Sequence, residues 1–293
     1  MANERLIRGR IRSAKNIAQI TRAMQMVAAS KMRRAQALAI SGRPYAEKIA
    51  EMVSEFVSRI DPASHPLLKK SGQGKTLIVL ISSNKGLCGG LNTNLFRHLV
   101  RTFPETVLQS SVFATLGKKG EQFVVRRQLT LAADFSQSTA MSLSIPSLTS
   151  YITKGFLADE FREVHLVYNN FISALRQEPT SKQLLPIAEF TVQKSEEVEK
   201  TSEPKAELDF LIEPSIEEIL DTLLFHYLEN QIRDAVLEAE ASEHSARMLA
   251  MKNATDNANE LVGLLTLEYN KARQEKITYE IADMVTARLA VEG

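Results

Sequence analysis

The chain has 293 residues, of which 44% are hydrophobic and 24% charged, and its formal net charge is +1. This composition is typical of a soluble globular protein rather than a disordered or collagen-like one, and the length leaves room for about two domains. The single cysteine, Cys88, excludes an intramolecular disulfide. No apolar run approaches the ~18 residues of a membrane-spanning helix, so we expect any membrane association to go through a partner.

The first 43 residues favour a basic amphipathic helix. They carry ten basic residues and one acidic residue, Glu4. An arginine-rich, acid-poor start also fits an organelle transit peptide, but the helical pattern continues well past residue 30, which favours a mature helix. Apolar or small residues recur in steps of three and four, which keeps them on one helix face: Ile7, Ile11, Ala14, Ile17, Thr21, Met24 and Ala28. Gly42 and Pro44 predict a kink or break before the pattern resumes.

The last 79 residues predict a second long helix of opposite charge. Ser215 follows Pro214 as an N-cap, and Glu218 completes a capping box. Residues 215–293 carry fifteen acidic and seven basic residues, against the basic first 43. Helices of this length need a packed face for stability. We therefore predict that residues 1–60 and 215–293 form an antiparallel coiled coil, with packing of both helices on other chains as the alternative.

Residues 70–214 predict a separate α/β domain. Apolar, β-rich runs at 75–81, 111–116, 164–171 and 187–192 indicate strands, and helices are expected at 91–102, 118–127 and 151–162. Strands that alternate with helices indicate a mainly parallel sheet. The polar stretch at 193–214 reads as an exposed hairpin or loop.

No assembled active site is visible in the sequence. The segment from Ser71 to Thr76 resembles a phosphate-binding loop but lacks its first glycine and precedes a strand instead of following one. The glycine-rich turn from Asn84 to Asn92 does follow a strand, yet a tight strand-to-helix turn explains it. The five histidines are scattered, without metal-ligand spacing. We expect no cofactor, no metal and no catalytic residue.

Four segments together resemble the gamma subunit of F-type ATP synthases. They are residues 11–34 (IRSAKNIAQITRAMQMVAASKMRR), 86–92 (GLCGGLN), 241–251 (ASEHSARMLAM) and 267–274 (LEYNKARQ). Several long motifs in the right order are much more specific than one short pattern. The resemblance implies a long antiparallel coiled coil of the N- and C-terminal helices, with a Rossmann-like α/β domain at its foot.

The resemblance also implies a function. A gamma subunit is the central rotating shaft, one copy inside a ring of three alpha and three beta subunits, held with the epsilon subunit on a membrane rotor ring. Proton or sodium flow turns it, and the catalytic residues belong to the beta subunits. The chain would then be a non-catalytic, peripheral protein, on the cytoplasmic face of a bacterial inner membrane rather than in an organelle, without nucleic acid as partner.

Individual residues match the family's contact positions. Arg273, Gln274 and Thr278 correspond to residues that contact the beta subunits on one face, and Met24 to a residue that faces another beta loop. Contacts with the rotor ring and epsilon would involve Tyr45 and the segment around Glu203 and Lys205.

The sequence departs from the family pattern at Asn84, where aspartate is common, and at Ala287 and Arg288 near the end of the last helix. An alternative from a different class is a stand-alone coiled-coil scaffold or a basic-helix nucleic-acid-binding protein. That alternative predicts an affinity for nucleic acid that falls steeply with salt.

Overall fold

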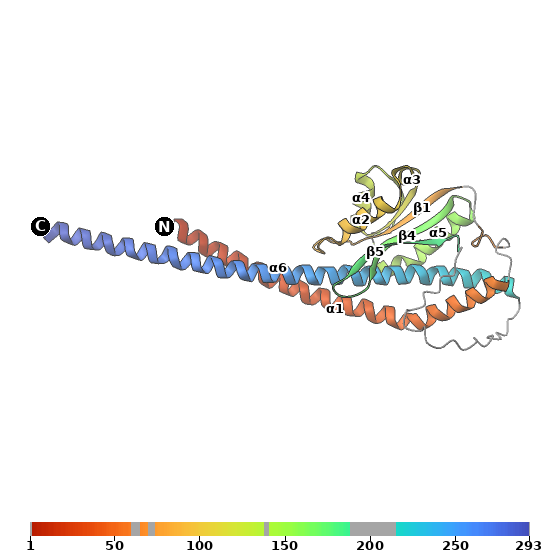
Figure 1. The fold of residues 1–293 in the computed structure, drawn as a ribbon, viewed down its shortest axis with the longest axis horizontal. Coiled ribbons are helices and arrows are strands. Elements are labelled where there is room, and N and C mark those ends of the chain that lie inside the picture. The colour runs from red at the N-terminus through yellow and green to blue at the C-terminus, as the bar shows by residue number, and fades with distance from the viewer. Residues whose placement is uncertain (1, 60–64, 70–73, 138–140, 188–214, 293) are drawn as a thin grey trace. The chain divides into compact units, whose positions relative to one another are not determined.

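The computed structural model describes residues 2–59, 65–69, 74–137, 141–187 and 215–292. Its contacts divide the chain into two units. Residues Met1–Ser30 and Arg247–Gly293 form what we call the helix-pair unit, and Lys31–Ala246 form the sheet unit. Two long helices, α1 (Ala2–Arg59) and α6 (Ile216–Glu292), each contribute to both units (Figure 1).

Helix α1 continues through Pro44, so of the predicted kink or break only the break is wrong. A proline inside a helix removes one backbone hydrogen bond and costs roughly 3 kcal/mol. The residues that follow compensate for this, because Ile49, Val53 and Phe56 are buried in the main core of the sheet unit. Figure 1 shows that the orange part of α1 bends without breaking.

Helix α6 begins directly after Ser215, as the capping pattern predicts, and runs for 77 residues. The Ile219 amide donates to the Ser215 carbonyl at 3.3 Å and closes the first turn. Gly263 lies inside the helix, and beyond the adjoining backbone nothing lies within 4 Å of where a Cβ would stand, so neither packing nor backbone geometry requires glycine there.

The sheet has five strands in the order β3-β2-β1-β4-β5. Strands β1 (Lys75–Ile81), β2 (Val112–Leu116), β3 (Thr130–Asp134) and β4 (Phe161–Phe171) are parallel to their neighbours, and β5 (Gln177–Leu185) pairs antiparallel with β4. The expected mainly parallel sheet is thus confirmed. Strand β1 has the predicted limits. Strand β2 begins one residue later than predicted, and β4 begins three residues earlier.

Both edge strands escaped prediction. Strand β3 is short and only partly buried, and β5 carries Pro179, Ser181 and Lys182 in place of an apolar alternation. Proline is tolerated at a sheet edge because one side of an edge strand needs no donor. Apart from Ile187, the strand predicted at 187–192 lies outside the described residues, as does the polar stretch at 193–214.

Helices cover both faces of the sheet. On one face, α2 (Leu91–Thr102), α3 (Glu105–Ser110) and α4 (Lys118–Arg126) close a core with Ile78, Leu80 and Phe113. On the other, α5 (Ile145–Leu157) and the sheet-unit parts of α1 and α6 pack on Leu77, Val79 and other alternate strand residues.

Helix α2 has the limits predicted for it, and α4 ends one residue earlier than predicted. Helix α5, which follows a short 3₁₀ turn at Met141–Ser144, begins and ends earlier than the predicted 151–162. Pro146 is the reason, because proline in the first turn starts a helix and does not break it.

Candidate functional site on the paired helix ends

A narrow seam of small side chains joins α1 and α6 in the helix-pair unit. The buried residues follow steps of three, four and seven, the repeat of a coiled coil. They are Ile7, Ala14, Ala18, Thr21 and Ala28 on α1, and Met251, Thr255, Ala258 and Leu265 on α6. The predicted coiled coil is confirmed, and its small residues let the two helices approach closely.

One member of the predicted α1 stripe lies on the wrong face. Ile17 is 52% exposed, whereas its neighbour Ala18 is 7% exposed. Ala18 continues the alternation of four and three residues that Ala14 and Thr21 define, and this 3.5-residue repeat decides which side chains enter the seam. The larger apolar side chain of Ile17 suggested the opposite choice.

Polar contacts join α1 and α6 at two places along the pair. The hydroxyls of Thr21 and Thr255 lie 2.7 Å apart inside the seam. Near the start of α1, Tyr269 Oη donates to Glu4 Oε1 at 3.1 Å and Lys276 Nζ lies 3.6 Å from Glu4 Oε2. Each hydroxyl also bonds a carbonyl of its own helix, so the contact between the two threonines adds one directional link to the apolar seam.

The basic and acidic ends of the chain are not matched charge for charge within the helix-pair unit. Within the helix-pair unit, α1 carries six basic residues and one acidic residue, while residues 247–293 carry six basic and seven acidic residues. Among described residues, Glu4–Lys276 is the one ion pair that joins α1 to α6 there. Most α1 cations in this unit, Arg8 and Arg12 among them, therefore have no acidic partner on α6.

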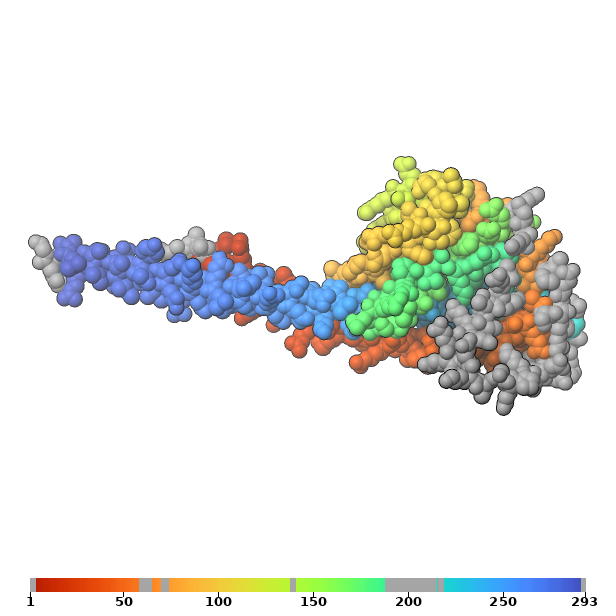
Figure 2. All heavy atoms as spheres, in the orientation of Figure 1, coloured from red at the N-terminus to blue at the C-terminus, as the bar shows by residue number. Residues whose placement is uncertain are grey.

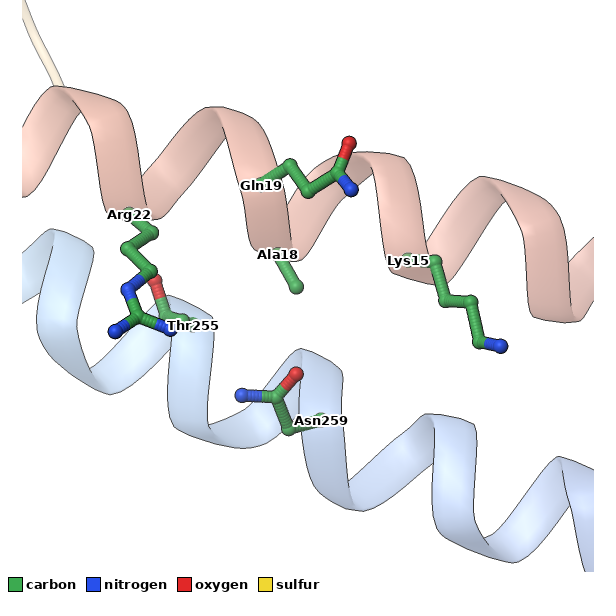
Figure 3. Close-up of a pocket in the computed structure, with 6 residues that line it drawn as sticks. All are labelled: Lys15, Ala18, Gln19, Arg22, Thr255 and Asn259. Carbon is green, nitrogen blue, oxygen red and sulfur yellow. The ribbon is translucent and has the colours of Figure 1, made fainter.

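A shallow polar pocket of about 210 Å³ lies beside the threonine pair. Lys15, Ala18, Gln19 and Arg22 line it from α1, and Thr255 and Asn259 from α6. Figure 3 shows Ala18 and Asn259 pointing into the space between the helices, with Arg22 reaching down beside Thr255. The pocket is small and open, and it has the charge for an acidic side chain rather than the volume of a cofactor site.

Large apolar side chains are exposed along both helices of this unit. They are Leu6, Ile17, Ile20, Met26 and Val27 on α1, and Leu261, Leu264, Leu267, Ile277, Tyr279, Ile281, Met284, Val285 and Leu289 on α6. Exposed apolar surface on this scale marks a site of protein–protein contact.

The expected beta-contact residues lie in this unit. Arg273, Gln274 and Thr278 are exposed on α6, and Thr278 Oγ1 donates to the Gln274 carbonyl at 3.0 Å, so these two share a face. Met24 is half-buried on α1. In the sheet unit, Tyr45 is 57% exposed on α1. Glu203 and Lys205 lie outside the described residues.

The glycine-rich turn after β1 is held by side chains of its own. Asn92 donates to Ser83 Oγ at 2.7 Å and to Cys88 Sγ at 3.4 Å. The Lys118 amide donates to Asn84 Oδ1 at 3.1 Å, which joins the turns after β1 and β2. Asn84 therefore supplies an acceptor without needing the aspartate charge, and the turn contains no recognisable catalytic group.

A group of ionisable side chains is buried between the sheet and α6 in the sheet unit. Burial raises the pKa of Asp234 and of Glu238, and it lowers the pKa of Lys182, which lies near both. Burial also raises the pKa of Tyr168, whose hydroxyl hydrogen-bonds to Glu238. Sequence reasoning missed this group, because Lys182 and Tyr168 lie on strands and the two carboxylates lie on α6 without a recognisable motif.

Neither a metal site nor a membrane span is found in the part of the chain that the structure describes. Those residues contain no cluster of three or more histidine, cysteine, aspartate or glutamate side chains able to hold a metal ion. Their helices include none that is long and apolar enough to cross a bilayer.

Comparison with known proteins decides the family. The model of a family described as ATP synthase matches residues 3–291. The ATP synthase gamma chain of Akkermansia muciniphila is 41% identical over 295 residues and covers all of both chains, and that of Geobacter metallireducens is 39% identical over 298 residues with the same coverage. The chain belongs to the ATP synthase gamma chain family.

Solved structures agree on the fold. The rotor of Euglena gracilis mitochondrial ATP synthase matches with a TM-score of 0.62 at 24% identity, covering 94% of this chain and 99% of that one. The central stalk and ring of Tetrahymena thermophila mitochondrial ATP synthase match with a TM-score of 0.58 at 27% identity, covering 80% and 99%.

Proposed function

We propose that the chain is the central rotating stalk subunit of an ion-driven ATP synthase. It couples proton or sodium flow through a membrane rotor ring to the conformational cycle of catalytic beta subunits. The observation that carries the proposal is the helix-pair unit of a gamma-family member, a thin rod whose exposed surface is apolar and basic. Such a surface suits a rod that turns inside a ring of other subunits.

The chain's part in the reaction is mechanical. An asymmetric rod stabilises one state of each neighbouring subunit more than another, and rotation passes that preference from subunit to subunit. No catalytic side chain is needed on the rod for this. The proposal places catalysis on the beta subunits and makes this chain a non-catalytic part of the enzyme.

The proposal assigns partners to the surfaces. Residues 1–60 and 215–293 form the shaft, whose helix-pair unit lies inside three alpha and three beta subunits, and Met24, Arg273, Gln274 and Thr278 contact beta. Residues 70–214 form the foot, which with Tyr45 and the segment around Glu203 and Lys205 meets epsilon and the rotor ring. The chain is then a peripheral protein on the cytoplasmic face of a bacterial inner membrane.

Reconstitution tests the proposal. The chain is mixed with alpha and beta subunits from the same source, and native mass and ATPase rate are recorded. One copy of the chain with three of each partner, and an ATPase rate above that of alpha and beta alone, is the expected result. If no complex forms but the chain binds nucleic acid with an affinity that falls steeply with salt, the basic-helix alternative replaces the proposal.

A further inference from the structure

A polar stripe runs along α6 beside its apolar stripe in the sheet unit. Gln231, Glu238, Ser242 and Ser245 follow one another at intervals of seven, four and three residues. These intervals keep the four side chains on one helix face. Each of them meets a group on β4, on β5 or on the turn between the two strands.

Two buried serines form the end of this stripe. Ser242 Oγ donates to the Asn169 carbonyl of β4 at 3.0 Å, and Ser245 Oγ donates to the Ala174 carbonyl of the β4–β5 turn at 2.6 Å. Gln177, at the start of β5, donates from Nε2 to Ser245 Oγ at 3.3 Å and to the Ala174 carbonyl at 3.2 Å. Both serines are fully buried, with 0% exposure.

The charged part of the stripe continues the contact along β4 and β5. Lys182 Nζ donates to Gln231 Oε1, and the Tyr168 hydroxyl hydrogen-bonds to Glu238. Asp234, one turn after Gln231, lies close enough to Lys182 for their charges to interact. Four successive turns of α6 are thus joined to two neighbouring strands by directional bonds.

Directional bonds do what the neighbouring apolar contacts cannot. Leu228, Ile232, Val236 and Ala239 of α6 also pack in this core, but the hydrophobic effect itself has no preferred direction. Buried polar groups are costly to separate, and their best-attested structural role is to fix register. The stripe therefore holds both the axial position and the rotation of α6 on the strands.

The clamp stands at the last turn of α6 in the sheet unit, which ends at Ala246. Figure 1 shows the β4–β5 hairpin reaching along α6, and Figure 2 shows green hairpin atoms lying directly against blue atoms of the helix. A connection at this turn stiffens the part of α6 that precedes the helix-pair unit in sequence.

We propose that Ser242 and Ser245, together with the Gln177 amide and the β4–β5 turn, form a clamp through which torque passes between the sheet and α6. This inference rests on the proposed rotary function. The serines are positioning residues: they keep the helix from twisting relative to the strands while load is applied.

The test compares twisting of the sheet with twisting of α6. A bead is attached at one of two positions, which we call the α4 handle and the α6 handle. In a Cys88→Ser background, a bead is attached through Arg126→Cys on α4 or through Thr222→Cys on α6, both exposed positions. With alpha and beta fixed to a surface and rotation arrested, the angular fluctuation of the bead is recorded. Ser242→Ala/Ser245→Ala should widen the fluctuation more at the α4 handle than at the α6 handle.

Controls separate the clamp from general loss of structure. Ser41→Ala removes an exposed serine hydroxyl on α1 that bonds the Leu38 carbonyl, and it should change neither handle. If the double variant does not assemble, Gln177→Ala tests the same turn from the other side, with the same expected difference between handles. Equal fluctuation at both handles in an assembled complex overturns the clamp, whereas failure of the unmodified chain to assemble overturns the proposed function instead.

Discussion

The two units are built on opposite principles, although the same two helices run through both. The sheet unit buries large side chains on both faces of its sheet, with Leu77, Ile78, Leu80 and Phe113 fully enclosed. The helix-pair unit buries mainly small side chains, such as Ala14, Ala18 and Ala28, and leaves many of its large ones exposed. The first is therefore stabilised by its own core, and the second is shaped for contact with other chains.

The largest expected effect is on the sheet unit, at the turn after β2. Gly117 has a φ of +116°, and a Cβ there would stand 2.0 Å from the Ser82 carbonyl oxygen. Because this contact is with backbone, β1 or the turn must move. We expect Gly117→Ala to lower the free energy of unfolding by about 3 kcal/mol, measured by urea denaturation.

A matched substitution in the other unit should have the opposite sign. Gly263→Ala adds its Cβ into open space in the middle of α6. Alanine favours a helix over glycine by up to ~1 kcal/mol, so this variant should be slightly more stable. If both alanine variants lose similar stability, packing at Gly117 is not the cause.

The second-largest expected effect is a pH dependence of folding stability, which comes from the sheet unit. Burial raises the pKa of Glu240, and Glu243 adds to this rise, whereas the Met141 amide and Lys31 oppose it. An acid whose pKa is higher in the folded state loses stability as pH rises from its unfolded pKa through the folded one. Glu240→Gln removes the ionisation and keeps an acceptor for the Met141 amide.

We therefore expect the variant's advantage in unfolding temperature over the unmodified chain to increase from pH 5 to pH 8. Glu260→Gln, an exposed site on α6 in the helix-pair unit, serves as the control and should show no such trend. A difference that stays constant across this range would contradict the assigned burial of Glu240.

A smaller loss of folding stability is expected from a substitution in the seam of the helix-pair unit. Thr21→Val keeps the shape of the side chain but removes the hydrogen bond to Thr255, which should cost about 1 kcal/mol. A double-mutant cycle with Thr255→Val measures the coupling by urea denaturation. Thr266→Val, whose hydroxyl bonds only the Val262 carbonyl of its own helix in the described structure, should show no coupling with Thr21→Val.

The smallest effect on stability should accompany a large effect on activity. Arg273 and Gln274 are exposed, so Arg273→Ala/Gln274→Ala should change the free energy of unfolding by no more than about 0.5 kcal/mol. In the reconstituted complex, the same double variant should lower coupled ATP hydrolysis. Normal turnover and torque would remove both residues from the proposed contacts.

The sequence predicted the long helices and the central strands because their patterns are continuous. The run at 77–81 is apolar throughout since β1 is covered on both faces, and 91–102 keeps one apolar stripe for a single core. The edge strands β3 and β5 could not be found in this way, because partial burial removes the apolar signal. The predicted break at Pro44 was wrong because tertiary packing outweighs the loss of one hydrogen bond.

The candidate site was predictable only in part. Exposed positions such as Arg273 and Gln274 came from resemblance to a family, since no local pattern distinguishes them from any solvated helix face. The stripe of Gln231, Glu238, Ser242 and Ser245 does have a 3.5-residue spacing that sequence reading could detect. Its meaning stays hidden without the partner strands, which are themselves weak in sequence.

The two outer strands have a consequence for the life of the chain before it reaches any partner. Strand β3 is only five residues long, and β5 carries Pro179 near its start. Short and proline-interrupted edges offer a poor template for pairing with a second copy, which protects a newly made sheet from aggregation. The helix-pair unit exposes much apolar surface before assembly. The protein therefore benefits from a sheet unit whose edge strands do not pair with a second copy.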